Sequence, residues 1–201
     1  MDLLGLNGIG DGDGGVYIKH STATKSWMLG ANAIEVKHLL VLPSSIQTGW
    51  GVYDGQYHWV WDEKPGVVCK QPTPDHRRAF SVALYLPDVG TKIWRRFSYG
   101  EGLGFNALTE LFWQDIKNNP DKCACVQYTG SRFEQYKVGS SVIPEFAFVK
   151  WADRPEDFML PNLGDNMSSN KEDTSEVDAA LGLDKKAEPV QETKTEDDLP
   201  F

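Results

Sequence analysis

Aromatic residues are almost entirely confined to the part of this 201-residue chain that precedes residue 159. Between Phe158 and the terminal Phe201 there is no Phe, Trp or Tyr, and residues 163–201 consist largely of Asp, Glu, Ser, Asn and Lys. A segment of this composition cannot bury enough apolar surface to offset the entropy that folding removes. We therefore expect a folded body followed by a disordered tail, with the whole hydrophobic core supplied by the body.

The net charge is divided at the same place. Residues 163–201 hold eleven acidic residues and four lysines, which accounts for −7 of the formal net charge of −9 and leaves −2 for residues 1–162. An acidic protein ordinarily lacks the basic surface that phosphate binding requires. Because most of the acidity lies in the tail, the net charge does not exclude nucleic acid as a partner of the body.

Composition also sets the expected domain boundaries. Residues 1–15 contain six glycines and are predicted to form a flexible N-terminal segment. Residues 16–158 contain short runs of aromatic and β-branched residues separated by Gly, Pro and Asp, which is typical of strands and turns. They are predicted to form the folded domain, and residues 159–201 the disordered acidic tail.

The order of predicted elements indicates a mainly β fold. Strands are predicted at Ile34–Leu42, Ala79–Leu86, Lys92–Tyr99, Lys122–Thr129 and Glu145–Trp151. A hairpin is predicted at Gly49–Asp62 around a type I′ turn at Asp54-Gly55, and a helix at Asn106–Asn118 with Asn106 as its cap. Gly100–Gly104, just before the helix, is expected to be a flexible connector. Three strands, a helix and two strands are the order of the OB-fold, a five-stranded barrel that binds oligonucleotides, and the hairpin is then an insertion in that barrel.

The predicted hairpin concentrates large aromatic rings. Alternation along the strand places Tyr57, Trp59 and Trp61 on one face, and Trp50 and Tyr53 belong to the same hairpin. Two interpretations are equally compatible with this pattern. The rings either pack onto the barrel or form a platform on which bases stack, at about 1–3 kcal/mol per base.

The strand Lys92–Tyr99 combines cations with a further tryptophan. Alternation places Lys92, Trp94 and Arg96 on one face, and Ile93, Arg95, Phe97 and Tyr99 on the other. The second face is the more apolar and is expected to face the core, with Arg95 at its rim. Trp94 and Tyr85 are then expected to point outward and to stack on bases, and the alternative is that Trp94 belongs to the core.

Cationic residues near these rings are candidates for phosphate contacts. Arg77 and Arg78 form the densest early cationic group and either contact phosphates or belong to a solvated loop. Arg132 is a further candidate. The residues predicted to bind nucleic acid are Trp50, Tyr53, Tyr57, Trp59, Trp61, Arg77, Arg78, Tyr85, Lys92, Trp94, Arg96 and Arg132.

The last six residues, 196–201, have the sequence EDDLPF. A solubilising tail has no reason to end in an exposed aromatic ring, whereas a ring and a terminal carboxylate can be captured together in a partner's pocket. This tip, behind a long acidic tail and an OB-like order of elements, resembles the C-terminal tip of bacterial and phage single-stranded DNA-binding proteins. The resemblance covers the tip and the layout of the chain.

This resemblance implies a protein that coats single-stranded DNA without sequence preference during replication, recombination or repair. It also implies that the tip recruits partner proteins of those processes, through Asp197, Asp198, Leu199, Pro200 and Phe201. The acidic tail is expected to compete with DNA for the cationic surface of the body. The alternatives are a protein–protein adaptor and a recombination mediator of the replication machinery.

Enzymatic signatures are weak in this sequence. The four histidines are scattered, Cys123 and Cys125 have no partners for a zinc site, and no nucleophile motif is present. We expect no catalytic residue, metal or cofactor, and a homo-oligomer is compatible with the sequence. The N-terminus shows no secretion signal and no run is long enough to cross a membrane, so a cytoplasmic protein is expected, in the host cytoplasm if the chain is viral.

Overall fold

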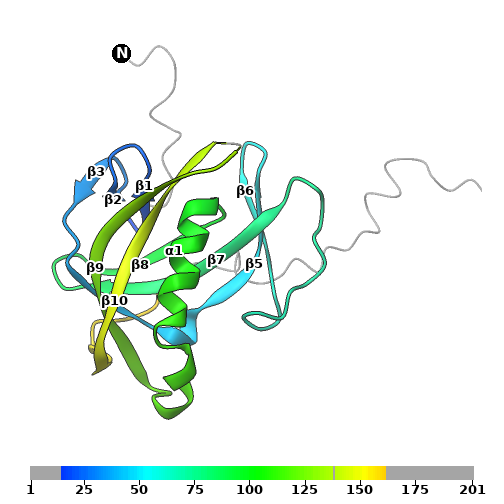
Figure 1. Ribbon diagram of the computed structural model, residues 1–201. Helices are drawn as coiled ribbons and strands as arrows, with labels where there is room; N and C mark the ends of the chain where they lie inside the picture. Colours follow the sequence, from blue (N-terminus) through cyan, green and yellow to red (C-terminus); the bar gives the residue numbers. More distant parts are fainter. Residues whose placement is uncertain (1–14, 138, 162–201) are drawn as a thin grey trace, which may run out of the picture. The chain divides into compact units, whose positions relative to one another are not determined.

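Ten strands form one sheet in the computed structural model of this protein, which describes residues 15–137 and 139–161 (Figure 1). The predicted N-terminal segment except Gly15, and nearly all of the tail including its tip, lie outside these residues. Half of the described residues are in strands, so the expected mainly β fold is confirmed. The strands are β1 (Tyr17–Ser21), β2 (Ser26–Leu29), β3 (Asn32–Ile34), β4 (His38–Val41), β5 (Gln47–Tyr53), β6 (Tyr57–Trp61), β7 (Arg77–Leu86), β8 (Gly90–Arg96), β9 (Lys122–Gln135) and β10 (Ser140–Asp153).

The strands pair in the order β10-β9-β4-β7-β8-β1-β2-β3, and β5 and β6 branch from β7. Within this order, β9-β4-β7-β8 is an antiparallel Greek-key arrangement. Strands β4, β7 and β8 are neighbours in that order, and β9, which comes later in the chain, returns to pair with β4. Short helix η2 (Pro43–Ser45) separates β4 from β5. Both of these strands pair with β7, β4 with its C-terminal part and β5 with its N-terminal part.

The sheet is not closed by hydrogen bonds, but it curls until strands from its two ends touch through side chains. Trp27 on β2 packs edge-on against Tyr128 on β9, with ring centroids 5.9 Å apart. His20 Nε2 on β1 lies 3.0 Å from Tyr128 Oη and 2.9 Å from Ser131 Oγ. Burial lowers the pKa of His20, so the ring is neutral in this contact at neutral pH.

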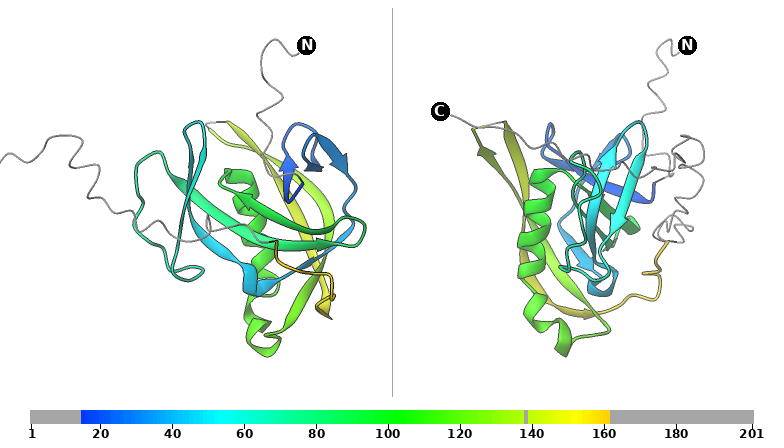
Figure 2. Two further views of the ribbon diagram at one scale, coloured as in Figure 1. Left: turned by 180° about the vertical axis from the view of Figure 1, so that it is seen from behind. Right: turned by 90° about the vertical axis from the view of Figure 1, so that its right-hand side faces the viewer.

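Helix α1 (Tyr99–Glu110) packs against β10 inside the curve of the sheet, and short helix η3 (Trp113–Asn118) follows it (Figures 1 and 2). Phe105 of α1 stacks on Phe80 of β7 with 4.2 Å between ring centroids. Trp94 lies against both rings and is fully buried. The main core therefore lies between α1 and the face of β7 and β8 that carries Phe80 and Trp94.

The helix begins earlier than the sequence indicated. Gly100–Gly104 was expected to be a connector with Asn106 as the cap, whereas α1 begins at Tyr99 and Ser98 occupies the N-cap position. The glycines are needed for close packing: a Cβ at Gly104 would lie 2.5 Å from Pro144 Cγ, and one at Gly100 would lie 2.7 Å from the Val142 carbonyl oxygen. Glycine in the helix thus lets α1 approach β10. The same glycines make the start of the helix hard to predict from the sequence.

A buried carboxylate fixes the start of this helix. Glu101 accepts hydrogen bonds from the backbone N–H of His20, from Trp94 Nε1 and from the Ser98 hydroxyl. It also lies 3.5 Å from Arg96. A buried acid is tolerated when it is paired and hydrogen-bonded in this way, so these contacts account for the burial of Glu101.

Several other predicted boundaries change. The single strand expected at Ile34–Leu42 is divided into β3 and β4, and the strand expected at Lys92–Tyr99 ends at Arg96. The hairpin is present, but its loop has three residues because Tyr53 pairs with Tyr57, so the type I′ assignment is wrong. In the described part of the chain, no helix is long and apolar enough to cross a bilayer.

Candidate nucleic-acid interface

Three rings of β6, Tyr57, Trp59 and Trp61, form a parallel stack that we call the aromatic ladder. The ring centroids of Tyr57 and Trp59 are 5.8 Å apart with planes at 13°, and those of Trp59 and Trp61 are 5.6 Å apart with planes at 5°. The predicted shared face of these three side chains is thus confirmed. Alternate residues of one strand produce this arrangement because they point to the same side of the sheet.

The ladder lies over the backbone of β5, where two glycines make room for it. Gly51 is paired with Trp59 and Gly49 with Trp61. A Cβ on Gly51 would lie 2.7 Å from Trp59 Cζ3, and one on Gly49 would lie 3.0 Å from Trp61 Cε3. Both indoles therefore occupy the space over strand β5 where side chains would otherwise stand.

Arg95 of β8 lies at the inner end of the ladder. Its Cζ is 5.3 Å from the ring centroid of Trp61, 5.5 Å from that of Trp59 and 5.3 Å from that of Tyr17 on β1. Its Nε donates to Ser81 Oγ at 3.3 Å, and only 6% of the residue is exposed. The sequence placed Arg95 at the rim of the core, whereas it is buried on the face opposite α1 and holds the two indoles by cation–π contacts.

Exposure increases along the ladder toward the tip of the hairpin. Trp59 and Trp61 are half-buried, whereas Tyr57 is 48% exposed and Tyr53, whose ring centroid lies 4.9 Å from that of Tyr57, is 50% exposed. Phe97 packs against the ladder 5.7 Å from Trp59. The packing alternative is thus confirmed for one edge of the ladder, which packs on the sheet, while the rest faces solvent and leaves the platform a prediction.

One predicted cation lies on the same face of the sheet as the ladder. Arg77 on β7 is paired with Gly51, and directly paired residues share a face. Arg77 is exposed, and so are Lys64 and Lys70 in the loop that leads from β6 to β7. Arg77 is therefore the cation that we consider for a phosphate contact beside the ladder, since the loop of Lys64 and Lys70 is held on the other face of β5 through Trp50 and Thr48.

Trp50 and Arg78 belong to a separate cluster on the other face of β5. The Arg78 guanidinium lies 5.0 Å from the Trp50 ring and donates two hydrogen bonds to Asp62, while Trp50 Nε1 donates to the Cys69 carbonyl oxygen. Burial alone would raise the pKa of Asp62, but hydrogen bonds from Arg78, Thr48 and the Cys69 backbone hold it well below its usual range. This cluster fixes the loop after β6, so Trp50 and Arg78 do not join the ladder.

Trp94 was expected to point outward, and this is wrong. The ring is fully buried, and its Nε1 donates to Glu101 at 3.0 Å. Both faces of β8 are covered, one by α1 and the other by residues around Ile93 and Phe158. Trp94 is therefore a core residue and is not available for stacking on bases.

The remaining predicted residues are dispersed over the fold. The Tyr85 hydroxyl donates to Asp157 and its ring packs on Phe158. Arg96 is paired with Glu101, and Arg132 lies between Glu134 and Glu145. Lys92 is half-buried on β8. The structure thus gathers Tyr53, Tyr57, Trp59, Trp61 and Arg77, and it adds Tyr17, Arg95 and Phe97, which sequence reasoning did not select.

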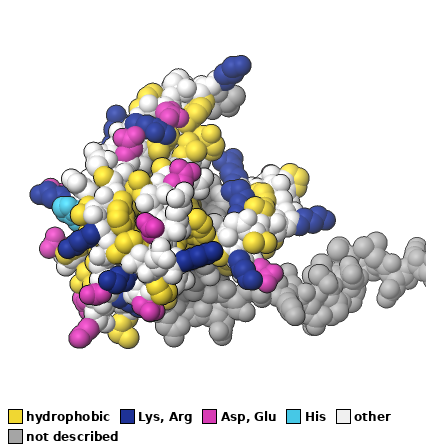
Figure 3. Space-filling model, turned by 60° about the horizontal axis from the view of Figure 1, so that its bottom comes forward, with side chains coloured by type: hydrophobic (Ala, Val, Ile, Leu, Met, Phe, Trp, Pro, Cys, Tyr) yellow, Lys and Arg dark blue, Asp and Glu magenta, His cyan; other side chains and the backbone are white. Residues whose placement is uncertain are grey.

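The charge of the described residues is nearly balanced. They contain sixteen Lys and Arg and fifteen Asp and Glu. Figure 3 shows both signs interspersed with apolar side chains over one face of the molecule. Within the described residues no group of His, Cys, Asp and Glu is placed to hold a metal ion. The ladder therefore offers stacking surface more than positive charge.

Comparison with known proteins gives no relative, since no family model, curated protein or solved structure matches this chain.

Proposed function

We propose that this protein binds single-stranded DNA without sequence preference, with bases stacking on the outer part of the aromatic ladder. The observation that carries the proposal is the preorganised, half-exposed stack of Tyr57, Trp59 and Trp61 over the glycines of β5. Every base has an aromatic face, so such a surface accepts any sequence. Rings already held in place lose little freedom when a strand binds, which favours affinity.

The topology supports the same proposal. The path β10-β9-β4-β7-β8, with α1 between β8 and β9 in the chain, is compatible with an OB-like barrel that is open between β8 and β10. In that fold, oligonucleotides bind on the face formed by the second and third strands and in the loop between the first two. On this interpretation those strands are β7 and β8, and the β5–β6 hairpin belongs to that loop.

Phosphate contacts are a minor part of the proposed interface. Arg77 is the exposed cation that shares a face with the ladder. If Arg77 contacts a phosphate, the logarithm of the binding constant falls with the logarithm of salt concentration with a slope of about −0.7. A strongly basic binding groove would give a much steeper slope, so the slope separates a stacking interface from an electrostatic one.

The acidic tail and its tip complete the proposal. By its resemblance to the tip of single-stranded DNA-binding proteins, EDDLPF at 196–201 recruits partner proteins of replication, recombination or repair. The body would then coat the strand while the tip remains available to partners. The tip lies outside the described residues, so this part of the proposal depends on the sequence.

The direct test is titration of the full chain with oligothymidylate while tryptophan fluorescence is recorded. We expect strong quenching that high salt reverses only in part, because stacking dominates. Trp59→Leu should weaken binding by about 1–3 kcal/mol and reduce the quenching. The matched control is Trp113→Leu, which changes a tryptophan that is 47% exposed and is not part of the ladder.

The outcome also decides between function classes. If oligothymidylate produces no quenching at low salt, or if the Trp59 and Trp113 variants bind alike, the ladder does not bind strands. The ladder would then be an aromatic surface for a polypeptide, as in the adaptor alternative.

A further inference from the structure

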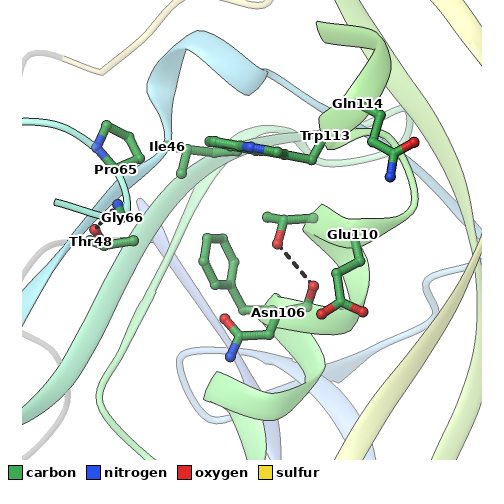
Figure 4. A pocket seen from close by; sticks show the side chains of 10 residues that line it. Ile46, Thr48, Pro65, Gly66, Asn106, Glu110, Trp113 and Gln114 are labelled. Atoms are coloured by element: carbon green, nitrogen blue, oxygen red, sulfur yellow. Dashed lines mark hydrogen bonds between the residues drawn. The ribbon is translucent and has the colours of Figure 1, made fainter. Parts of the chain in front are cut away.

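A pocket of about 550 Å³ lies between α1, η3 and the start of β5, on the side of the sheet away from the ladder (Figure 4). Its apolar floor includes Ile46 and Phe105, which are 5% and 4% exposed. Trp113 forms one side with its ring seen edge-on, and Asn106 lies on the opposite side. The volume is within the range of sites that hold small ligands or short peptide segments.

Three polar side chains of this pocket have no partner among the described residues. The side chains of Asn106, Glu110 and Gln114 make no hydrogen bond or ion pair with any described residue. Thr109, by contrast, donates to the Asn106 carbonyl oxygen, and Thr48 is used by Asp62 and Gly66. Three side chains that can accept hydrogen bonds are therefore available around an exposed indole.

Charge selects among the occupants of such a pocket. Glu110 is the one charged side chain among the lining residues, all of which are described, so a phosphate or a carboxylate is disfavoured there. A guanidinium matches the indole and the acceptors present: it stacks on an indole face, pairs with a carboxylate, and donates to amide oxygens. Its aliphatic stem suits the apolar floor.

We propose that this pocket binds an arginine side chain presented by an apolar segment of a partner protein. The surface is separate from the ladder and does not depend on nucleic acid binding. The acidic tip of this chain is a poor chemical match for the pocket, because Glu110 carries the same sign of charge. The protein would then hold a basic segment of one partner on its body, by a contact distinct from the one proposed for the tail.

The test uses the full chain, labelled with ¹⁵N, and two peptides that differ in one group. Acetyl-Leu-Arg-Leu-amide should move the indole N–H signal of Trp113, which is assigned by its loss in Trp113→Phe. The citrulline peptide, which has the same shape without the charge, should bind about 5- to 20-fold more weakly, since it loses both the cation–π contact and the ion pair. Signals of Trp59 and Trp61 should not move.

A pair of variants tests the role of the carboxylate. Glu110→Gln should weaken the arginine peptide about 2- to 5-fold and leave the citrulline peptide unchanged. Glu156→Gln, at an exposed acid outside the pocket, should change neither. Both sites are exposed, so the variants are expected to fold.

Three results would overturn the proposal. The first is equal binding of the arginine and citrulline peptides, and the second is an unchanged affinity in Glu110→Gln. The third is movement of the Trp113 signal by adenosine and not by the arginine peptide, which would identify a base-binding pocket. The first two results do not bear on strand binding by the ladder.

Discussion

Substituting alanine for Gly51 tests whether the alignment of the ladder, and not only its composition, creates the binding surface. The added Cβ would lie 2.7 Å from Trp59 Cζ3 and 3.0 Å from Phe97 Cδ1. Ordinary contact begins near 3.4 Å, so the indole has to move by about 0.7 Å or rotate away. The parallel stack of Trp59 with its two neighbours is then lost, while every aromatic residue remains in the chain.

The expected loss is larger in binding than in stability. Trp59 is half-buried and can move toward solvent, so we expect a stability cost of about 1 kcal/mol, at the low end for overpacking. Loss of one stacked base costs about 1–3 kcal/mol, which corresponds to an affinity about 5- to 150-fold weaker. Urea unfolding measures the first quantity, and fluorescence anisotropy of a labelled oligothymidylate measures the second.

The matched control is Gly102→Ala in α1. Gly102 has nothing within 4 Å of a built Cβ, so alanine there is expected to be neutral or to stabilise the helix by up to about 1 kcal/mol. Affinity for the oligonucleotide should be unchanged in this variant. If Gly51→Ala lowers stability while its affinity equals that of the control, ring alignment has no role in binding and the preorganisation argument fails.

Three further predictions concern the surroundings of the ladder. Arg95→Met removes the cation–π contacts with Trp59 and Trp61. It should therefore reduce the free energy of unfolding by about 1–3 kcal/mol and abolish the exciton signal of the stacked indoles in circular dichroism. An unchanged exciton signal would show that the glycines alone align the rings. Asp62→Asn should cost about 1–3 kcal/mol at pH 7 by urea unfolding, since charge-assisted hydrogen bonds from Arg78 are weakened. The pKa of Asp62 is lower in the folded than in the unfolded state, so the wild-type protein's extra stability over Asp62→Asn should be complete above about pH 4 and diminish below it. A stability difference that does not change with pH would contradict this account. Deleting residues 163–201 should tighten oligonucleotide binding at low salt and have less effect at high salt, and equal affinities across salt concentrations would exclude competition by the tail.

Strand periodicity was sufficient to predict the central feature of the candidate site. Alternation placed Tyr57, Trp59 and Trp61 on one face, and this needs only the two-residue repeat of a strand. The same rule failed for β8, since it separates two faces without indicating which is buried. Both faces of β8 are covered, which placed Trp94 in the core and Arg95 among the rings on the opposite side.

Other parts of the site depend on contacts between residues distant in the sequence. Arg95 meets Tyr17 and Trp59 because β1, β8 and the β5–β6 hairpin converge, and no local pattern indicates that convergence. Gly49 and Gly51 have a role only because indoles from the next strand lie on them. Gly100 and Gly104 obscured the start of α1 for a similar reason, since the approach of β10 is what requires them.

The sequence by itself determined the mainly β class and the shared face of the three ladder rings, because composition and strand alternation are local properties. It also carries the predicted acidic tail and its tip. Only the tertiary structure decided which aromatic residues are exposed, which cations are already paired, and that a pocket opens beside Trp113. Exposure and pairing depend on neighbours brought together by folding. A tryptophan in the core and a tryptophan in a binding surface can therefore have the same sequence pattern.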